Sequence, residues 1–243
     1  MNFLLYYLFI IWIFCSCTEL SRLESALLQS GANCPEREKV LSHYEDEPMK
    51  YCAACFLIEH MPGKYSLEAE SVDDPYRNFL RYIPAKDSIN WKLDSCHVGH
   101  LLDSVAQLAI PRTRKVEDLQ AVTADFLIDN IDRAFHAWET SKYTRHYTFD
   151  DFLHHVLPYR IGHEPLTPWR GKAYERYAHL LDSAFTPLQV AVDMAMNEGM
   201  RYNIGMTKYP YLQSYEEMAA SRWGACEEMA AYLALSLRAV GIP

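Results

Sequence analysis

The stretch Ser221-Arg222-Trp223-Gly224-Ala225-Cys226-Glu227-Glu228-Met229-Ala230 decides the fold of the C-terminal part of this 243-residue chain. It opens a predicted helix from about Ala225 to Val240, and Gly241 is suited to end that helix in a left-handed conformation. Helical spacing places one set of residues on a common face, which we expect to point toward the interior: Cys226, Met229, Ala230, Leu233, Leu237 and Val240.

Cys226 would occupy the first turn of this helix. The N-terminus of a helix carries a partial positive charge and unpaired N–H groups, which stabilise a thiolate and can hold an oxyanion. The sequence therefore makes Cys226 a candidate nucleophile. The alternative is that an inward-facing cysteine is only a small core hydrophobe.

The segment 223–230, followed by a helix that ends in Arg238-Ala239-Val240-Gly241-Ile242-Pro243, resembles the nucleophile helix of the transglutaminase-like superfamily. In that family Gly-x-Cys opens a buried helix of a papain-like core, and Gly-Ile-Pro ends it. Residues 53–62, 123–130 and 149–169 resemble, more loosely, the N-terminal extension of envelope-anchored bacterial members. The resemblance implies an α+β fold, in which a mostly helical extension leads into the first helix of a core whose sheet is largely missing from this chain.

The resemblance also implies a Cys-His-Asp triad in which the Cys226 thiolate attacks an amide or acyl carbonyl. In the family the histidine and aspartate lie on strands after the cysteine helix, and residues 227–243 contain neither. Three explanations stay open: the sequence is truncated, which we favour; an upstream histidine such as His154, His155 or His163 is the partner; or the domain is inactive.

The N-terminus is predicted to be a targeting segment rather than part of the fold. Phe3 to Phe14 is an unbroken apolar run of twelve residues, which as a helix of about 18 Å is too short to cross a hydrocarbon core of about 30 Å. Ser16 before Cys17 resembles a bacterial lipobox, so we expect lipidation at Cys17 and an exported protein anchored in the bacterial cell envelope. A plain cleaved signal peptide, giving a secreted or periplasmic protein, or a short anchor is the alternative.

The amino-acid composition limits the kinds of partner that this protein can bind. The formal net charge is −9 and the Lys and Arg residues are scattered, which argues against a nucleic-acid partner. Half of the chain is apolar, so a substantial core is expected. Five of the seven cysteines follow the leader, and this odd number suggests one free thiol, for which Cys226 is the natural candidate. The pairing of the other four is not decided by the sequence: Cys34, Cys52, Cys55 and Cys96.

The chain is divided into a leader at 1–17, a helical region at 18–200 and the start of a transglutaminase-like domain at 201–243. The spacing of apolar residues, together with capping residues and prolines, predicts helices over the ranges 36–44, 48–61, 94–109, 117–139, 149–156 and 173–196 with a bend at Pro187. Thr148 to Asp151 is a capping motif for the helix at 149–156, and Ser214 to Glu217 is a capping box that opens a further short helix. In the range 117–139 one apolar stripe is formed by Leu127, Ile131, Ala134, Phe135 and Trp138. Residues 64–93 are predicted to be loop, and 202–212 extended.

Weaker candidate sites are interpreted mainly as structure. Cys52 and Cys55 have the spacing of a redox or metal pair, but they lie inside an apolar helix. Cys96, His97 and His100 supply three metal ligands without an evident fourth. The proline-rich loop 157–168 has the mixture of aromatic and charged residues found in a cleft wall, and the candidate substrate-binding residues are Trp223, Arg160 and Trp169.

From the resemblance we expect an envelope-anchored cysteine hydrolase or acyltransferase that acts on amide bonds of peptides or glycopeptides, without a metal or another cofactor. The alternative is a non-catalytic binding or assembly lipoprotein that retains the fold. A third possibility, a thiol redox protein, depends on Cys52 and Cys55.

Overall fold

The computed structural model describes residues 22–70, 99–100, 103–104, 112–182, 185–202 and 211–243. This part of the chain is mostly helical and contains two small two-stranded sheets, so the coarse prediction of an α+β fold dominated by helices is confirmed. None of the helices in these ranges is both long enough and apolar enough to span a membrane. The targeting segment and the predicted helix at 94–109 lie wholly or mostly outside the described residues.

The chain forms two compact units, residues 1–64 with 117–131 and residues 65–116 with 132–243. These boundaries differ from the predicted division at residue 200, which stays a prediction. The elements of the first unit are a helix over 22–29, η1 (Gly31–Asn33), α2 (Cys34–His43), α3 (Pro48–Glu59), α6 (Asp118–Ala121) and the first half of α7 (Ala124–Thr140).

The predicted helix over 117–139 is broken after α6, and α2 supplies the reason. The side chain of Arg37, buried on α2, donates from Nη2 to the carbonyl oxygens of Asp118, Leu119 and Val122, the last at 2.6 Å. The Glu36 carboxylate accepts from the first N–H of α7, that of Ala124, at 2.6 Å. A cation at the carbonyl end of α6 and an anion at the N-terminus of α7 satisfy groups that a continuous helix would have paired internally.

The second unit contains the remaining elements: β1 (Tyr65–Ala69), β2 (Thr113–Glu117, whose last residue falls in the first unit), the second half of α7, η3 (Lys142–His146), α8 (Phe149–Asp151), the π-helical turn η4 (Phe152–Val156), α9 (Trp169–Tyr177), η5 (Ala178–Asp182), α10 (Pro187–Asn197), β3 (Arg201–Tyr202), α11 (Tyr215–Ser221), β4 (Trp223–Gly224) and α12 (Cys226–Ala239).

Two predictions for this unit are corrected. Residues 65–69 form strand β1 instead of loop, because they pair with β2, which lies more than forty positions along the chain and was not visible to a local pattern. The single helix predicted over 173–196 is two helices. Pro187 is the first residue of α10, where its missing N–H costs nothing, and the Thr186 side chain caps that helix by accepting from the Gln189 N–H.

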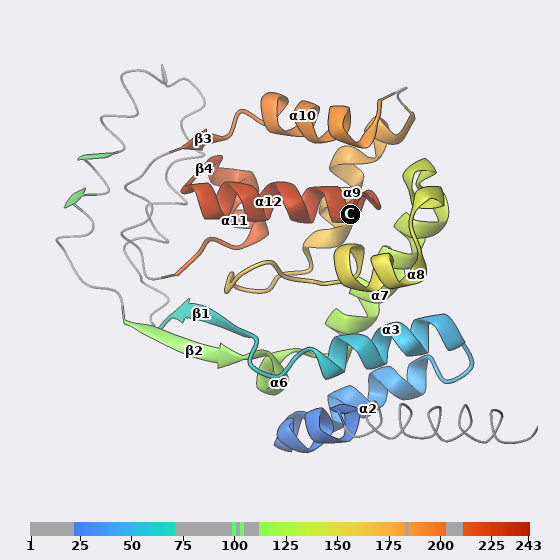
Figure 1. Cartoon of the computed structure of the whole chain (residues 1–243). Helices are drawn as coiled ribbons and strands as arrows, with labels where there is room; N and C mark the ends of the chain where they lie inside the picture. Colours follow the sequence, from blue (N-terminus) through green and yellow to red (C-terminus); the bar gives the residue numbers. More distant parts are fainter. Residues whose placement is uncertain (1–21, 71–98, 101–102, 105–111, 183–184, 203–210) are drawn as a thin grey trace, which may run out of the picture. The chain divides into compact units, whose positions relative to one another are not determined.

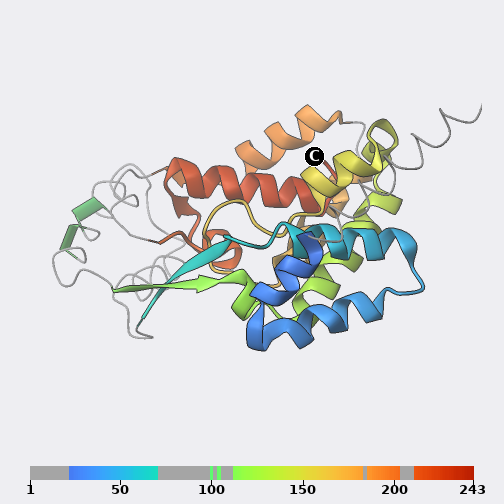
Figure 2. The ribbon, with the colours of Figure 1, turned by 60° about the horizontal axis from the view of Figure 1, so that its bottom comes forward.

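Helix α12 forms the centre of the second unit (Figure 1). It packs against α9, α10 and α11, and both views show it running beside α10 (Figure 2). At its C-terminal end Gly241 has a φ of +74°, its N–H donates to Arg238, and the Ile242 N–H donates to Leu237. This is the Schellman arrangement, so the predicted glycine cap is confirmed.

Candidate functional site

The N-terminus of α12 is built by a sharp change of direction between two helices. Ser214 caps α11 in a complete capping box with Glu217, as the sequence predicts. Arg222 then adopts a left-handed conformation with φ of 56°, which turns the chain out of α11 and into β4. Strand β4 pairs in parallel with β3, with Trp223 opposite Arg201. The pairing of β3 with β4 therefore fixes Trp223 and Gly224, Ala225 follows as the N-cap, and α12 begins at Cys226.

The Cys226 side chain is exposed, and the prediction that it points into the core is wrong. At about 100° per residue, the buried side of α12 lies roughly opposite Cys226. The buried residues are Glu228, Ala231, Tyr232, Leu235, Ser236 and Ala239. This helix is apolar around most of its circumference, and both of its apolar sides are packed. Side chains of α9 and α11 cover the side opposite Cys226, whereas α10 covers only the later part of the Cys226 side, through Leu233, Leu237 and Val240.

Along the face that carries Cys226, the side chains become more buried from the first turn of α12 to the last. Ala230 is exposed, Met229 and Leu233 are half-buried, and Val240 at the far end is fully buried. The thiol therefore lies at the solvent end of this face, in the first turn of a fourteen-residue helix. This placement suits a nucleophile better than a core position does, because a substrate can reach it.

Glu228 anchors this turn from the buried side. One carboxylate oxygen accepts from the Ala225 N–H at 2.8 Å, and the other accepts from the backbone N–H of Gln213 at 3.0 Å. Desolvation raises the pKa of Glu228, although these hydrogen bonds oppose the shift. Gln213 also donates from Nε2 to the Trp223 carbonyl at 2.7 Å and accepts from the Ser221 hydroxyl at 2.8 Å. Through Gln213 the loop before α11 is thus tied to the end of α11, to β4 and to the first turn of α12.

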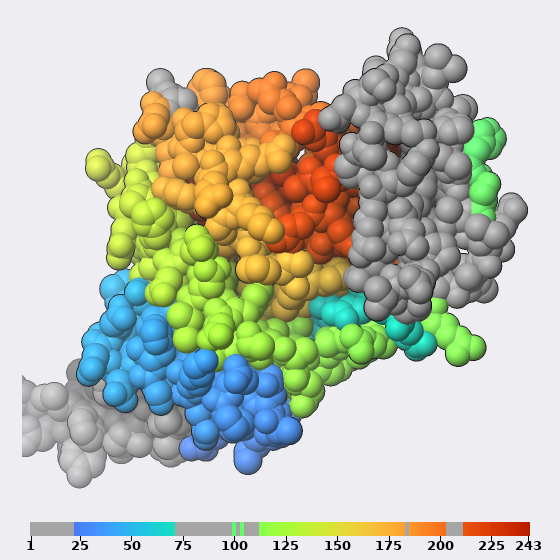
Figure 3. Space-filling view, turned by 180° about the vertical axis from the view of Figure 1, so that it is seen from behind, coloured from blue at the N-terminus to red at the C-terminus, as the bar shows by residue number. Residues whose placement is uncertain are grey.

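A pocket of about 170 Å³ opens between α10 and α12. Three of the four α12 residues in its lining, Met229, Ala230 and Leu233, lie on the Cys226 face. In Figure 3 residues of the red C-terminal segment reach the surface beside orange residues of the α9–α10 segment. The opposite side of the pocket is lined by Met194, Ala195 and Met200, and its polar end by Tyr177, Glu198 and Tyr232.

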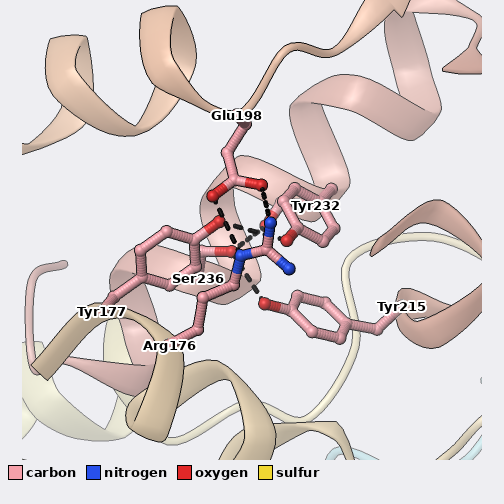
Figure 4. A network of polar contacts seen from close by, with 6 residues as sticks. All are labelled: Arg176, Tyr177, Glu198, Tyr215, Tyr232 and Ser236. Carbon is pink, nitrogen blue, oxygen red and sulfur yellow. Dashed lines mark hydrogen bonds and ion pairs between the residues drawn. The ribbon is translucent and has the colours of Figure 1, made fainter. Parts of the chain in front are cut away.

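The polar end belongs to a network that crosses four elements (Figure 4). Arg176 donates from Nε and Nη2 to the two carboxylate oxygens of Glu198, at 3.0 and 2.6 Å. Tyr177 contacts the Tyr232 hydroxyl at 3.1 Å and also hydrogen-bonds Glu198. Burial, followed by the neighbouring carboxylate, raises the pKa of Tyr177 far above its ordinary value, so its phenol stays neutral. The network gives the pocket hydroxyl groups and a neutralised carboxylate in place of a free charge.

The three predicted substrate-binding residues are all buried by structural contacts. Arg160 donates to the carbonyl oxygens of Tyr65 and Gly162, at 2.8 and 3.0 Å, and so ties its loop to β1. Trp169 donates from Nε1 to the Tyr159 carbonyl at 2.9 Å and packs in the core under α12. Trp223 is 4% exposed. We therefore leave these side chains out of the candidate site.

Contacts made by α12 show where the histidines proposed as upstream partners lie. Arg238 donates from Nε to the His155 carbonyl at 2.9 Å. Arg238 is twelve residues after Cys226, about 18 Å along the helix axis. By contrast, the Glu227 carboxylate lies 3.7 Å from the position that a Cβ on Gly162 would take. Gly162 therefore lies near the first turn of α12, although the carbonyl of Arg160 in the same loop accepts from Arg238 at 3.0 Å. The His163 ring stacks on the Tyr65 ring, with centroids 5.0 Å apart, and His155 lies near the last turn of α12.

The structure does not place the other candidate cysteines and histidines in an arrangement typical of a redox or metal site in the described ranges. Cys34, Cys52 and Cys55 are free thiols in the structure. Desolvation raises the pKa of Cys55 to about 11, which opposes the thiolate that a redox pair needs. Cys96 and His97 lie outside the described residues, and the described ranges contain no cluster of three or more residues arranged to bind a metal.

Comparison of the chain with protein-family models, with curated proteins and with solved structures found no match.

Proposed function

We propose that the chain belongs to an envelope-anchored cysteine hydrolase or acyltransferase of the transglutaminase-like kind, with Cys226 as its nucleophile and a papain-like arrangement around α12. The observation that carries this proposal is the exposed thiol in the first turn of a long helix, beside a pocket lined by the same helical face. The structure supports accessibility and placement; the triad itself is part of the proposal.

In the proposed reaction the Cys226 sulfur forms a bond to the carbonyl carbon of a peptide or glycopeptide amide. The C–N bond then breaks, and the amine leaves with the proton that a general base took from the thiol. Water or a second amine attacks the thioester, releases the acyl group and restores the thiol. Unpaired N–H groups at the start of α12 would stabilise the oxyanion.

The general base has two candidate sources. The resemblance places it on a strand after the cysteine helix, and residues 227–243 contain no histidine. His163 is the candidate within the described chain, because the neighbouring Gly162 approaches Glu227. Its ring is stacked on Tyr65, so it would have to turn away from that ring to reach the thiol. Changing His163 to Asn, with His155→Asn as the matched control, tests this candidate. A loss of thiol reactivity confined to the first variant identifies His163 as the base, and no loss in either variant excludes it.

Thiol reactivity tests the nucleophile directly. Alkylation of the full-length protein by iodoacetamide at pH 6 to 7 is followed by mass spectrometry of the peptides that contain Cys226 and Cys52. Both thiols are exposed, so Cys52 is the matched reference. We expect Cys226 to react at least tenfold faster and to form a thioester adduct with an activated acyl donor. Equal rates for the two thiols, with no adduct, would contradict the proposal.

A non-catalytic binding protein is the second candidate, and the apolar pocket is the observation that favours it. If a ligand binds in the pocket and Cys226 is unreactive toward iodoacetamide, the protein is a binding protein and not a cysteine hydrolase.

Anchoring at Cys17 is a separate part of the proposal. Radiolabelled palmitate should be incorporated into the wild-type protein and into a Cys15→Ala variant, but not into Cys17→Ala. Label retained in the last variant would exclude this site.

A further inference from the structure

The pocket between α10 and α12 is suited to an uncharged, apolar group. Its walls come from methionine, alanine and leucine side chains, among them Met194, Met200 and Met229. The one carboxylate in its lining, Glu198, is already paired with Arg176 through two hydrogen bonds. A cationic or anionic group entering the pocket would lose its hydration without gaining an opposite free charge, so charged groups are disfavoured.

The volume restricts the size of that group. An engineered apolar cavity of about 150 Å³ in another protein holds one benzene molecule, and this pocket has about 170 Å³. Pockets for drug-sized molecules and cofactors begin at about 300 Å³. The space therefore holds one group of about four to six carbon atoms. Methionine walls can adjust to the shape of such a group, because this side chain is unbranched and polarizable.

The position of the pocket relates it to Cys226. Three lining residues, Met229, Ala230 and Leu233, follow Cys226 by three, four and seven positions. At about 100° per residue they lie within about 60° of Cys226 around the helix, and the first two are only about 5 to 6 Å further along its axis. Successive residues of a peptide are about 3.8 Å apart. A peptide whose carbonyl lies at the sulfur would place the side chain one or two residues away over the pocket.

We infer that this pocket binds a single aliphatic side chain, of the leucine, isoleucine or methionine class, from a peptide, and that it selects the acyl donor for Cys226. The second half of this inference rests on the proposed function. The binding half rests on the pocket alone.

The binding half is tested in the full chain by methyl NMR of labelled methionines, with N-acetyl-leucinamide as the probe and N-acetyl-alaninamide as its smaller control. We expect the signals of Met194, Met200 and Met229 to shift with the leucine probe, in the millimolar range, and to shift at least fivefold less with the alanine probe. Changing Ala230 to Leu fills the pocket and should abolish the shifts. Ala234→Leu, on the same helix but outside the pocket lining, is the matched control, and Ala195→Leu is a second filling variant on α10 if the first fails to fold.

The selection half is tested with pairs of peptide chloromethyl ketones in which the residue one position, or two positions, before the reactive residue is leucine or alanine. The Cys226 sulfur forms a bond to the methylene carbon as chloride leaves. We expect the leucine reagent to label Cys226 at least tenfold faster, and Ala230→Leu to remove the difference. If both reagents label Cys226 equally and the methionine signals do not shift, the inference is overturned, although a fast reaction with iodoacetamide would leave the proposed function standing. If the methionine signals shift but Cys226 reacts no faster than Cys52, the proposed function fails and the binding half remains.

Discussion

Replacing Arg170 by methionine should destabilise the second unit more than any comparable change on its surface. Arg170 is 1% exposed and stands between two helix ends. Its guanidinium donates from Nη1 to the Arg238 carbonyl in the last turn of α12, at 3.2 Å. From Nη2 it donates to the carbonyl oxygens of Val156 and Leu157 after the π-helical turn, at 3.0 and 3.1 Å. It also stacks over the Trp169 ring at 4.6 Å.

The magnitude follows from what methionine leaves behind. Methionine fills much of the arginine volume, so the cavity cost is small. It donates no hydrogen bond, however, and the carbonyl oxygens at both helix ends lose a charged donor in a buried place. Each such loss costs about 1 to 3 kcal/mol, partly offset because the buried charge disappears too. We expect a net loss of about 3 kcal/mol, which corresponds to a fall in Tm of about 6 to 12 °C for a chain of this size.

Urea unfolding followed by tryptophan fluorescence measures the change. The described tryptophans all lie in this unit: Trp138, Trp169 and Trp223. Lys172→Met is the control, because Lys172 is exposed and its ion pair with Glu216 contributes less than about 1 kcal/mol. If Arg170→Met shifts the urea midpoint no more than this control does, with an unchanged slope, the guanidinium does not hold the two helix ends as described.

Three further changes have expected outcomes. Gly241→Ala should cost about 1 to 2 kcal/mol in chemical denaturation, because φ is +74° and the new Cβ would lie 2.9 Å from the Ala137 carbonyl oxygen; an unchanged midpoint would refute the strain. Burial raises the pKa of Glu228 in the folded protein, so its contribution to stability is complete below the ordinary value and is lost as the pH rises through the folded value. Between pH 4 and 7 the urea midpoint of the wild-type protein should therefore fall more steeply with pH than that of the Glu228→Gln variant. If the midpoints of the two proteins change in parallel with pH, the pKa of Glu228 is not raised by folding. The Cys55 thiol, with its pKa raised to about 11, should be alkylated at pH 8 far more slowly than Cys52. Comparable alkylation rates for the two thiols would favour the hypothesis that they form a redox pair.

Local chemistry made several elements predictable. The capping boxes at Thr148 and Ser214 and the glycine after α12 depend on residues three or four positions apart, and all three were confirmed. The apolar stripe of α7 was also confirmed, because Leu127 and Ile131 on that face are fully buried. These signals are readable from the sequence since both partners of each interaction are neighbours in the chain.

The candidate site was only half predictable. Sequence placed Cys226 in the first turn of a helix, which the structure bears out, but it also placed the thiol in the core. The pocket between α10 and α12 was missed. Its one visible signal was the set of methionine and leucine residues on the Cys226 face, which was interpreted as core packing.

The sequence by itself determined the ends of the helices that carry their own capping box or terminal glycine, because capping, proline and glycine act over a few residues. Tertiary structure decided which partners those helices meet. It broke the helix at Val122 by presenting Arg37 and Glu36 to the two exposed ends, and it converted residues 65–69 into a strand by supplying β2. It also left the first turns of the Cys226 face of α12 toward solvent and a pocket, because α9 and α11 cover the opposite face and α10 covers the later part of this one. A helix that is apolar on both sides carries no local signal for that choice, and only the surfaces packed against it can make it.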